Sequence, residues 1–149
     1  MKVDSALIST KVNFAVDVYQ HGKHISHEER HNLVVNAGVA WLLNLMAGAS
    51  GYTALTKFAV GTSGTAPAAG DTDLGAQVIL GDMTETTFAT GKVTFKYYLG
   101  SGVGNGNTLR EAGLKDVAGH LFARSTFTDV EKDATKVIIF TWVITIGVV

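Results

Sequence analysis

Hydrophobic and polar residues alternate with a period of two along much of this chain. In residues 10–19, Val12, Phe14, Val16 and Val18 are separated by single residues that are polar or small. Successive side chains of a strand point to opposite sides of a sheet, so this spacing predicts a strand with one buried face. Comparable patterns predict strands at residues 24–31, 55–60, 76–80, 85–89, 92–99, 108–115, 120–128 and 136–146. The first of these is polar enough to be an edge strand or a loop.

One segment, residues 37–47, has helical spacing instead. Its apolar residues fall three or four positions apart, at Val39, Leu42, Leu43 and Met46. Asn36 precedes the segment as a candidate N-cap, and Gly48 follows it where a C-terminal cap belongs. Because Trp41 and Leu45 add a neighbouring apolar stripe, we expect this helix to be buried on more than half its circumference, against a sheet or another subunit.

This order of elements predicts the fold class. Many short strands, one helix and no regular alternation of strand and helix are typical of a mainly β protein. We therefore expect an antiparallel β-sandwich or partly open barrel with one short buried α-helix. A single helical turn capped by Asp71 is expected at residues 71–75. No internal repeat or linker is visible, so residues 1–149 are interpreted as a single domain.

The amino-acid composition excludes several classes of function. Charged residues make up 17% of the chain, against roughly 25% in average proteins, so we expect a partner to cover some neutral or apolar surface. The net charge of −1 and the absence of a basic cluster argue against nucleic acid as a partner. No apolar run reaches the roughly 20 residues of a membrane span or forms a signal peptide, so we expect a soluble, unexported protein. The lack of cysteine excludes disulfides and thiolate chemistry.

The most suggestive chemistry is a histidine run beside two glutamates, Glu28 and Glu29. Imidazole and carboxylate are ligands of zinc, which makes four residues the candidate metal ligands: His21, His24, His27 and His31. The flanking pattern does not predict the helix that would bring two of them to one face. We therefore expect a solvated polar hairpin and no bound metal.

Other candidate sites lack essential parts. The glycine-rich residues 100–106 follow a strand, but the Gly-Lys-Ser/Thr ending and the following helix of a phosphate-binding loop are missing. Asp71 and Asp73 could serve acid–base chemistry or bind calcium, but turn capping explains them better. No Gly-x-Ser-x-Gly elbow occurs. We therefore expect neither an enzyme nor a cofactor.

Two features indicate a subunit interface. Arg110 and Glu111 are adjacent on a predicted strand, so their side chains should point to opposite faces and find separate partners. These partners could lie on another subunit, or both side chains could face solvent. In the most apolar strand, Phe140, Trp142 and Ile144 share one face, which places them in the core or in an interface. These five residues are our candidate interface residues, whereas Lys115 is expected in an exposed turn.

Three stretches, taken together and in order, resemble a family of small structural proteins of tailed bacteriophages and the corresponding modules of phage tail fibres. The first is residues 32–38, leading into the apolar helix. The second is residues 58–67, followed by residues 71–74. The third runs from residues 98–102 through the Thr-Leu-Arg-Glu-Ala-Gly-Leu segment at 108–114 to residues 120–124 and 140–144. The histidine-rich segment before Asn32 has no counterpart in the resemblance.

The resemblance implies a non-enzymatic subunit in the virion, assembled in the host cytoplasm with other virion proteins. We expect a homo-oligomer, with a trimer favoured because fibres and decoration caps are often three-fold. A tail-associated station (fibre, collar or baseplate) is the first interpretation, and a capsid decoration protein that clamps capsid subunits is the alternative. A host carbohydrate-binding module ranks third, with Tyr52, Tyr97 and Tyr98 as candidate aromatics.

Overall fold

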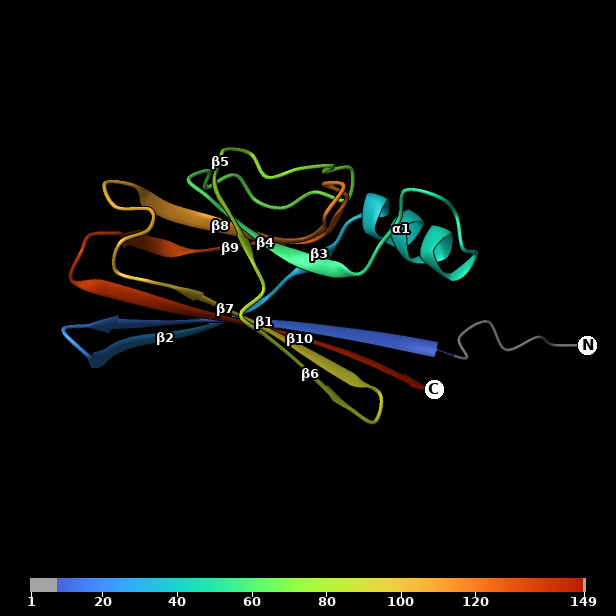
Figure 1. Cartoon of the computed structure of the whole chain (residues 1–149), viewed down its shortest axis with the longest axis horizontal. Helices are drawn as coiled ribbons and strands as arrows, with labels where there is room; N and C mark the ends of the chain where they lie inside the picture. The colour runs from blue at the N-terminus through green and yellow to red at the C-terminus, as the bar shows by residue number, and fades with distance from the viewer. Residues whose placement is uncertain (1–7, 149) are drawn as a thin grey trace, which may run out of the picture.

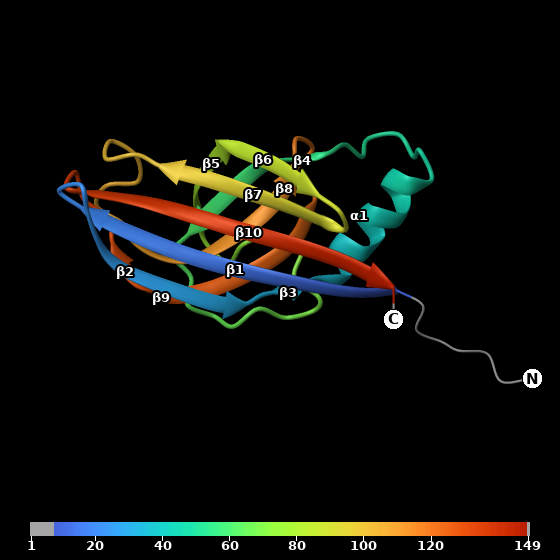
Figure 2. The ribbon, with the colours of Figure 1, turned by 90° about the horizontal axis from the view of Figure 1, so that it is seen from below.

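Two antiparallel sheets packed face to face form the molecule, in a computed structural model that describes residues 8–148 (Figure 1). Sheet A has the strand order β2 (Lys23–His31), β1 (Ile8–Gln20), β10 (Lys136–Val148), β7 (Lys92–Leu99) and β6 (Glu85–Ala89) (Figure 2). Sheet B has the order β3 (Leu33–Val34), β9 (Leu121–Glu131), β8 (Thr108–Asp116), β4 (Leu55–Gly61) and β5 (Gln77–Asp82). The sheets do not close into a barrel. The prediction of a mainly β protein is confirmed, and its architecture is a sandwich.

Aromatic side chains fill the space between the sheets. In sheet A, Phe14 lies opposite Trp142 in the pairing of β1 with β10, and their ring centroids are 4.5 Å apart. From sheet B, Phe58 packs on Phe140 with centroids 5.2 Å apart. These four side chains are almost completely buried. Alternation along β1 and β10 therefore places their apolar residues in the core, as the spacing predicts.

A side-chain bridge satisfies the one polar group of the buried Trp142 ring. Asn32 lies in the link between β2 and β3, where the chain passes from sheet A to sheet B. With its amide oriented to satisfy both groups, Asn32 accepts a hydrogen bond from Trp142 Nε1 at 2.9 Å and donates one to the carbonyl oxygen of Val12 at 2.8 Å. A buried indole N–H normally needs such a partner.

The helix α1 (Asn36–Met46) departs from two expectations. Val35 precedes it without a side-chain cap, and Asn36 is its first residue, not its cap. Only Gly38 and Trp41 are buried, while the other side of the helix faces solvent. Gly38 brings the helix against β9, since a Cβ there would lie 2.0 Å from the carbonyl oxygen of Phe122. Within one chain, α1 contacts the sandwich through these two residues and, less completely, through Leu42 and Leu45, at one end of the molecule (Figure 1). The sheet alone therefore does not give the expected burial of over half its circumference, and burial against another subunit stays a prediction. At eleven residues, the helix is too short to cross a membrane.

The chain between β4 and β5, residues 62–76, forms a long irregular strap over the outer face of sheet B (Figure 1). The helical turn expected at residues 71–75 does not form. Instead, Asp71 Oδ2 accepts the backbone N–H of Ala68 at 2.9 Å and contacts Arg124 at 2.9 Å. Its carboxylate therefore binds backwards along the strap and down onto the sheet, and does not cap a following turn.

Candidate functional site

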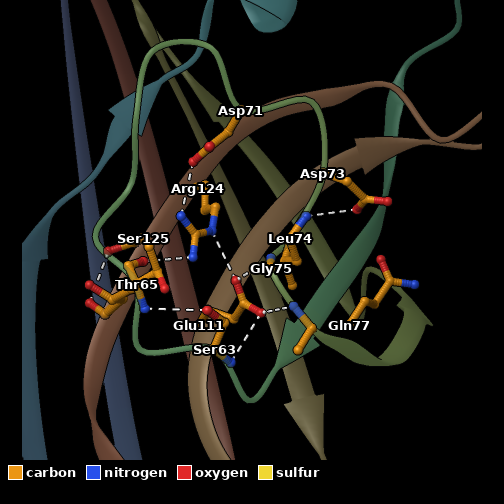
Figure 3. A network of polar contacts seen from close by, with 12 residues as sticks. Ser63, Thr65, Asp71, Asp73, Leu74, Gly75, Gln77, Glu111, Arg124 and Ser125 are labelled. Atoms are coloured by element: carbon orange, nitrogen blue, oxygen red, sulfur yellow. Dashed lines mark hydrogen bonds and ion pairs between the residues drawn. The ribbon is translucent and has the colours of Figure 1, made fainter.

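A buried carboxylate holds both ends of the strap (Figure 3). Glu111, on the outer face of sheet B, is fully buried. Its Oε1 accepts hydrogen bonds from the backbone N–H groups of Ala76 at 2.7 Å and Ser63 at 3.3 Å. Its Oε2 accepts one from the backbone N–H of Gly75 at 2.9 Å and one from the side-chain Nε of Arg124 at 2.9 Å. One side chain thus binds Ser63 near the start of the strap and Gly75 and Ala76 at its end.

The guanidinium of Arg124 completes this network from the neighbouring strand β9. Besides Glu111, it binds Asp71 Oδ2 through Nη1 at 2.9 Å and the carbonyl oxygen of Thr65 through Nη2 at 2.8 Å. Arg124 is only 2% exposed. The Ala68 N–H and the Arg124 guanidinium hold the pKa of Asp71 below its ordinary value. We call Glu111, Arg124 and Asp71, with the strap groups that they bind, the strap network.

Small residues make room for the strap network. A Cβ on Gly61 would lie 2.4 Å from Glu111 Oε1 and 2.5 Å from the carbonyl oxygen of Ala76. A Cβ on Gly113 would lie 2.6 Å from Leu74 Cδ1, because Leu74 packs from the strap onto β8. Beneath Leu74 is a second small apolar cluster, formed with Val35, Ala59 and Leu121. Both the charged contacts of the strap network and the apolar packing of Leu74 therefore hold the strap against sheet B.

The neighbouring Arg110 has partners of its own. It forms a two-pronged ion pair with Asp129 on β9, at 3.0 and 3.1 Å, and donates to the carbonyl oxygen of Thr62 at 3.2 Å. Arg110 and Glu111 find separate partners, as predicted, but the prediction that their side chains point to opposite faces is wrong, because both contact the strap on one face of sheet B. A register shift between β8 and β9 occurs at this point, between Leu109 and Glu111, and both charged side chains reach the strap.

The structure corrects the interface assignment for four of the five candidates. Glu111, Phe140 and Trp142 are 0% exposed and Ile144 is 7% exposed. Glu111 is covered by the strap, and the other three lie between the two sheets. Side chains enclosed in this way cannot contact a second subunit. Arg110, which is partly exposed, is the one candidate that reaches the surface.

The histidine run forms a different cluster, on the outer surface where β2 pairs with β1. Asp17 Oδ1 lies 2.9 Å from His24 Nε2 and 2.6 Å from His27 Nδ1, and His27 Nε2 lies 3.4 Å from Glu29 Oε1. Hydrogen bonds to Asp17 and then Glu29 raise the pKa of His27. Residues 8–148 contain no group of three or more His, Asp or Glu side chains arranged to hold a metal ion. Two of the candidate ligands lie outside this cluster, His21 and His31.

The remaining candidate residues serve loops and ion pairs within the chain. The glycine-rich loop surrounds a cation, because Lys132 Nζ donates to Asn105 Oδ1 at 2.8 Å and to the carbonyl oxygen of Ser101 at 3.3 Å. The loop thus directs oxygen acceptors inwards, whereas a phosphate-binding loop directs its backbone N–H donors at the ligand. Asp73 pairs with Lys115, which also donates to Gln77 at 2.6 Å. Lys115 is 5% exposed, so its expected place in an exposed turn is wrong.

Large apolar side chains gather on the surface in two places. The helix patch consists of Val39, Leu43 and Met46, which are 50%, 61% and 74% exposed. The edge patch consists of Val78 and Leu80 on β5, which are 46% and 52% exposed, and Phe88 on β6, which is 81% exposed; these strands are edges of sheets B and A. Large apolar side chains left exposed together, as on the helix, are typical of sites where another protein binds.

Sequence reasoning missed the edge patch, although a signal for it was present. Val78, Ile79 and Leu80 are consecutive, so a strand through them must be apolar on both faces. Only Ile79 is buried. The missing information was that β5 and β6 are edge strands, which depends on sheet order and not on local pattern.

Comparisons of the chain with protein-family models, curated proteins and solved structures give no match.

Proposed function

We propose that this chain is a non-enzymatic structural subunit of a tailed-bacteriophage virion, stationed on the tail as part of a fibre, collar or baseplate and working as a homo-oligomer. The observation that carries the proposal is the pair of exposed apolar patches on a sandwich whose charged side chains are largely engaged within the chain. Apolar surface of this kind favours a protein that is covered by neighbours in an assembly.

The polar networks support a structural role. The strap network, the Arg110–Asp129 pair and the Lys132 loop all use their charges to fix connections between strands. Each of these groups already has its partners within the chain. Rigid loops on a β-sandwich suit a subunit that presents a fixed surface to its neighbours.

The carbohydrate-binding alternative is weaker because two of its three aromatics are engaged. Tyr97 is buried and stacks on Phe58, with centroids 5.1 Å apart. Tyr52 stacks on His120 at 4.4 Å. Tyr98 alone has an exposed ring, at 52%. A single exposed ring supports this alternative less than the exposed apolar surface supports the structural role, so we keep the structural role.

The test is to locate the chain on particles. Virions purified from the host that produces them should contain the chain as a stoichiometric component by quantitative mass spectrometry, at a copy number divisible by three if the trimer is correct. Gold-labelled antibody against the purified chain should bind the tail in electron micrographs. Label on the capsid would instead support the decoration protein, and absence of the chain from particles free of host cytoplasmic proteins would contradict both.

A further inference from the structure

Strand β6 offers an unpaired edge. It is the last strand of sheet A, and all five of its residues, Glu85–Ala89, are exposed. Within the described residues, its backbone N–H and C=O groups bond β7 on one side and no protein group on the other. Figure 1 shows the β6–β7 hairpin reaching beyond sheet B, so the second sheet does not cover this edge.

Most proteins protect such an edge with charges, proline or a bulge, and the opposite side of this sandwich does so. Seven of the nine residues of β2 are Lys, Arg, Glu or His, and its ladder with β1 contains a register shift. Glu28 also joins β2 to sheet B by accepting the N–H of Thr128 at 3.0 Å. In contrast, β6 contains one charge and no proline, and its ladder with β7 has no register shift.

We propose that β6 of one copy pairs antiparallel with β6 of a second copy across a two-fold axis at Thr87, joining two A sheets into one continuous sheet. The inference rests on the proposed function, because it names a contact by which the subunits assemble. In this register, Glu85 lies opposite Ala89 of the second copy, and Thr86 lies opposite Phe88. No like charges therefore meet across the joint.

The side chains complement each other on both faces of this joint. Phe88 shares the inner face with Val93, its neighbour on β7, and the two Phe88 rings become diagonal neighbours, within reach of each other. On the outer face, Glu85 already neighbours Lys96. Pairing sets Glu85 beside Ala89 of the second copy, whose own neighbour on β7 is Lys92. The most exposed apolar side chain is thus covered, and Glu85 lies between lysines of both copies.

A two-fold contact of this kind produces a dimer, or joins two trimers into a hexamer if the favoured trimer forms through another surface. The proposal therefore requires an even number of subunits.

Thr87 provides the test because it would meet its own copy at the axis. Thr87→Lys and Thr87→Glu each place two like charges opposite each other, at an exposed position where the fold should tolerate the change. Each variant should fall about twofold in mass by light scattering and native mass spectrometry, whereas an equimolar mixture of the two should recover the even-numbered assembly. Thr72→Lys, the same kind of change at an exposed strap position outside both apolar patches, is the matched control and should keep the wild-type mass. Circular dichroism should show all variants folded.

A monomeric wild-type chain would overturn the proposal, even if β6 bound another virion protein. So would an assembly that both Thr87 variants leave intact, or a mixture that does not reassemble. The two proposals fail separately. A chain that pairs through β6 but is absent from virions would remove the virion function and keep the contact, whereas a chain present in virions that never pairs would do the reverse.

Discussion

Two clusters of acidic and basic side chains on this sandwich differ chiefly in burial. In the strap network, Glu111 and Arg124 are at most 2% exposed and hold residues 62–76 against sheet B. In the cluster on β1 and β2, which we call the edge cluster, Asp17 binds His24 and His27, whose side chains are 46% exposed. Both clusters set a carboxylate between two or more donors at ordinary hydrogen-bond distances.

Their surroundings give these similar geometries different energies. Removing one partner of a buried ion pair leaves an uncompensated charge away from water, which typically costs about 3–5 kcal/mol. Exposed ion pairs contribute roughly 0–1 kcal/mol, because water solvates both partners when they separate. We therefore expect the strap network to support the fold, and the edge cluster to do little for stability while keeping β2 polar enough to resist pairing with other chains.

Glu111→Ala should have the largest effect. The substitution leaves Arg124 with a smaller set of acceptors and removes the acceptor of three strap N–H groups. We expect the free energy of unfolding to fall by about 3–5 kcal/mol in chemical denaturation. Glu131→Ala, which removes an exposed carboxylate on β9, is the control and should change little. Equal effects of the two substitutions would remove the distinction between buried and exposed charge.

Gly61→Ala should disturb the same network without changing a charge. The new methyl group would lie 2.4 Å from Glu111 Oε1, so the carboxylate or the strap must move. Overpacking of this kind typically costs about 1–3 kcal/mol, and we expect a loss in that range by thermal and chemical denaturation. Gly70→Ala is the matched control, since nothing lies within 4 Å of a Cβ at that strap position. A Gly61→Ala variant as stable as wild type would show that the strap yields easily.

Asp71→Asn should have a smaller effect, because the Asp71 side chain is 26% exposed. We expect a loss of about 1 kcal/mol and faster proteolysis within the strap. The pKa of Asp71 is lowered in the folded state, so its contribution is present above the unfolded value of 3.8 and is lost as pH falls through the folded pKa. In Asp71→Asn, which has no carboxylate to protonate, the free energy of unfolding should therefore fall less between neutral and acid pH than in wild type. Identical acid profiles for variant and wild type would contradict this role.

Local pattern was enough to predict most of the strands and a mainly β fold, but it left a sandwich and a partly open barrel as alternatives. The alternation of Phe14, Val16 and Val18, and of Phe140 and Trp142, requires one buried face, and these residues form the core. Pattern could not give sheet order, because edge and interior strands differ only in their neighbours. That gap explains why the edge patch at Phe88 was missed.

Long-range polar contacts were also beyond the sequence. Adjacent Arg110 and Glu111 indicated separate partners, but the partners of Glu111 lie 13 to 48 positions away along the chain. The strap covers Glu111 only because residues 62–76 fold back over sheet B. The histidines are close together in the sequence and form a visible pattern, whereas the side chains that fix the strap are single residues spread across two strands and a loop, which leave no local pattern.

The smallest expected effect concerns the edge cluster and pH. Hydrogen bonds to Asp17 and then Glu29 raise the pKa of His27 in the folded chain above its ordinary 6.5. A raised folded pKa means that the contribution to stability is fully present below 6.5 and is lost as pH rises through the folded value. Because His27 is exposed, we expect this change to be hard to detect by denaturation, so the direct measurement is an NMR titration of the His27 ring. Asp17→Asn should lower its midpoint towards 6.5, and Glu29→Gln should lower it less. If Asp17→Asn leaves the midpoint unchanged, Asp17 does not hold the imidazole, and the edge cluster is no more than a set of neighbouring polar side chains.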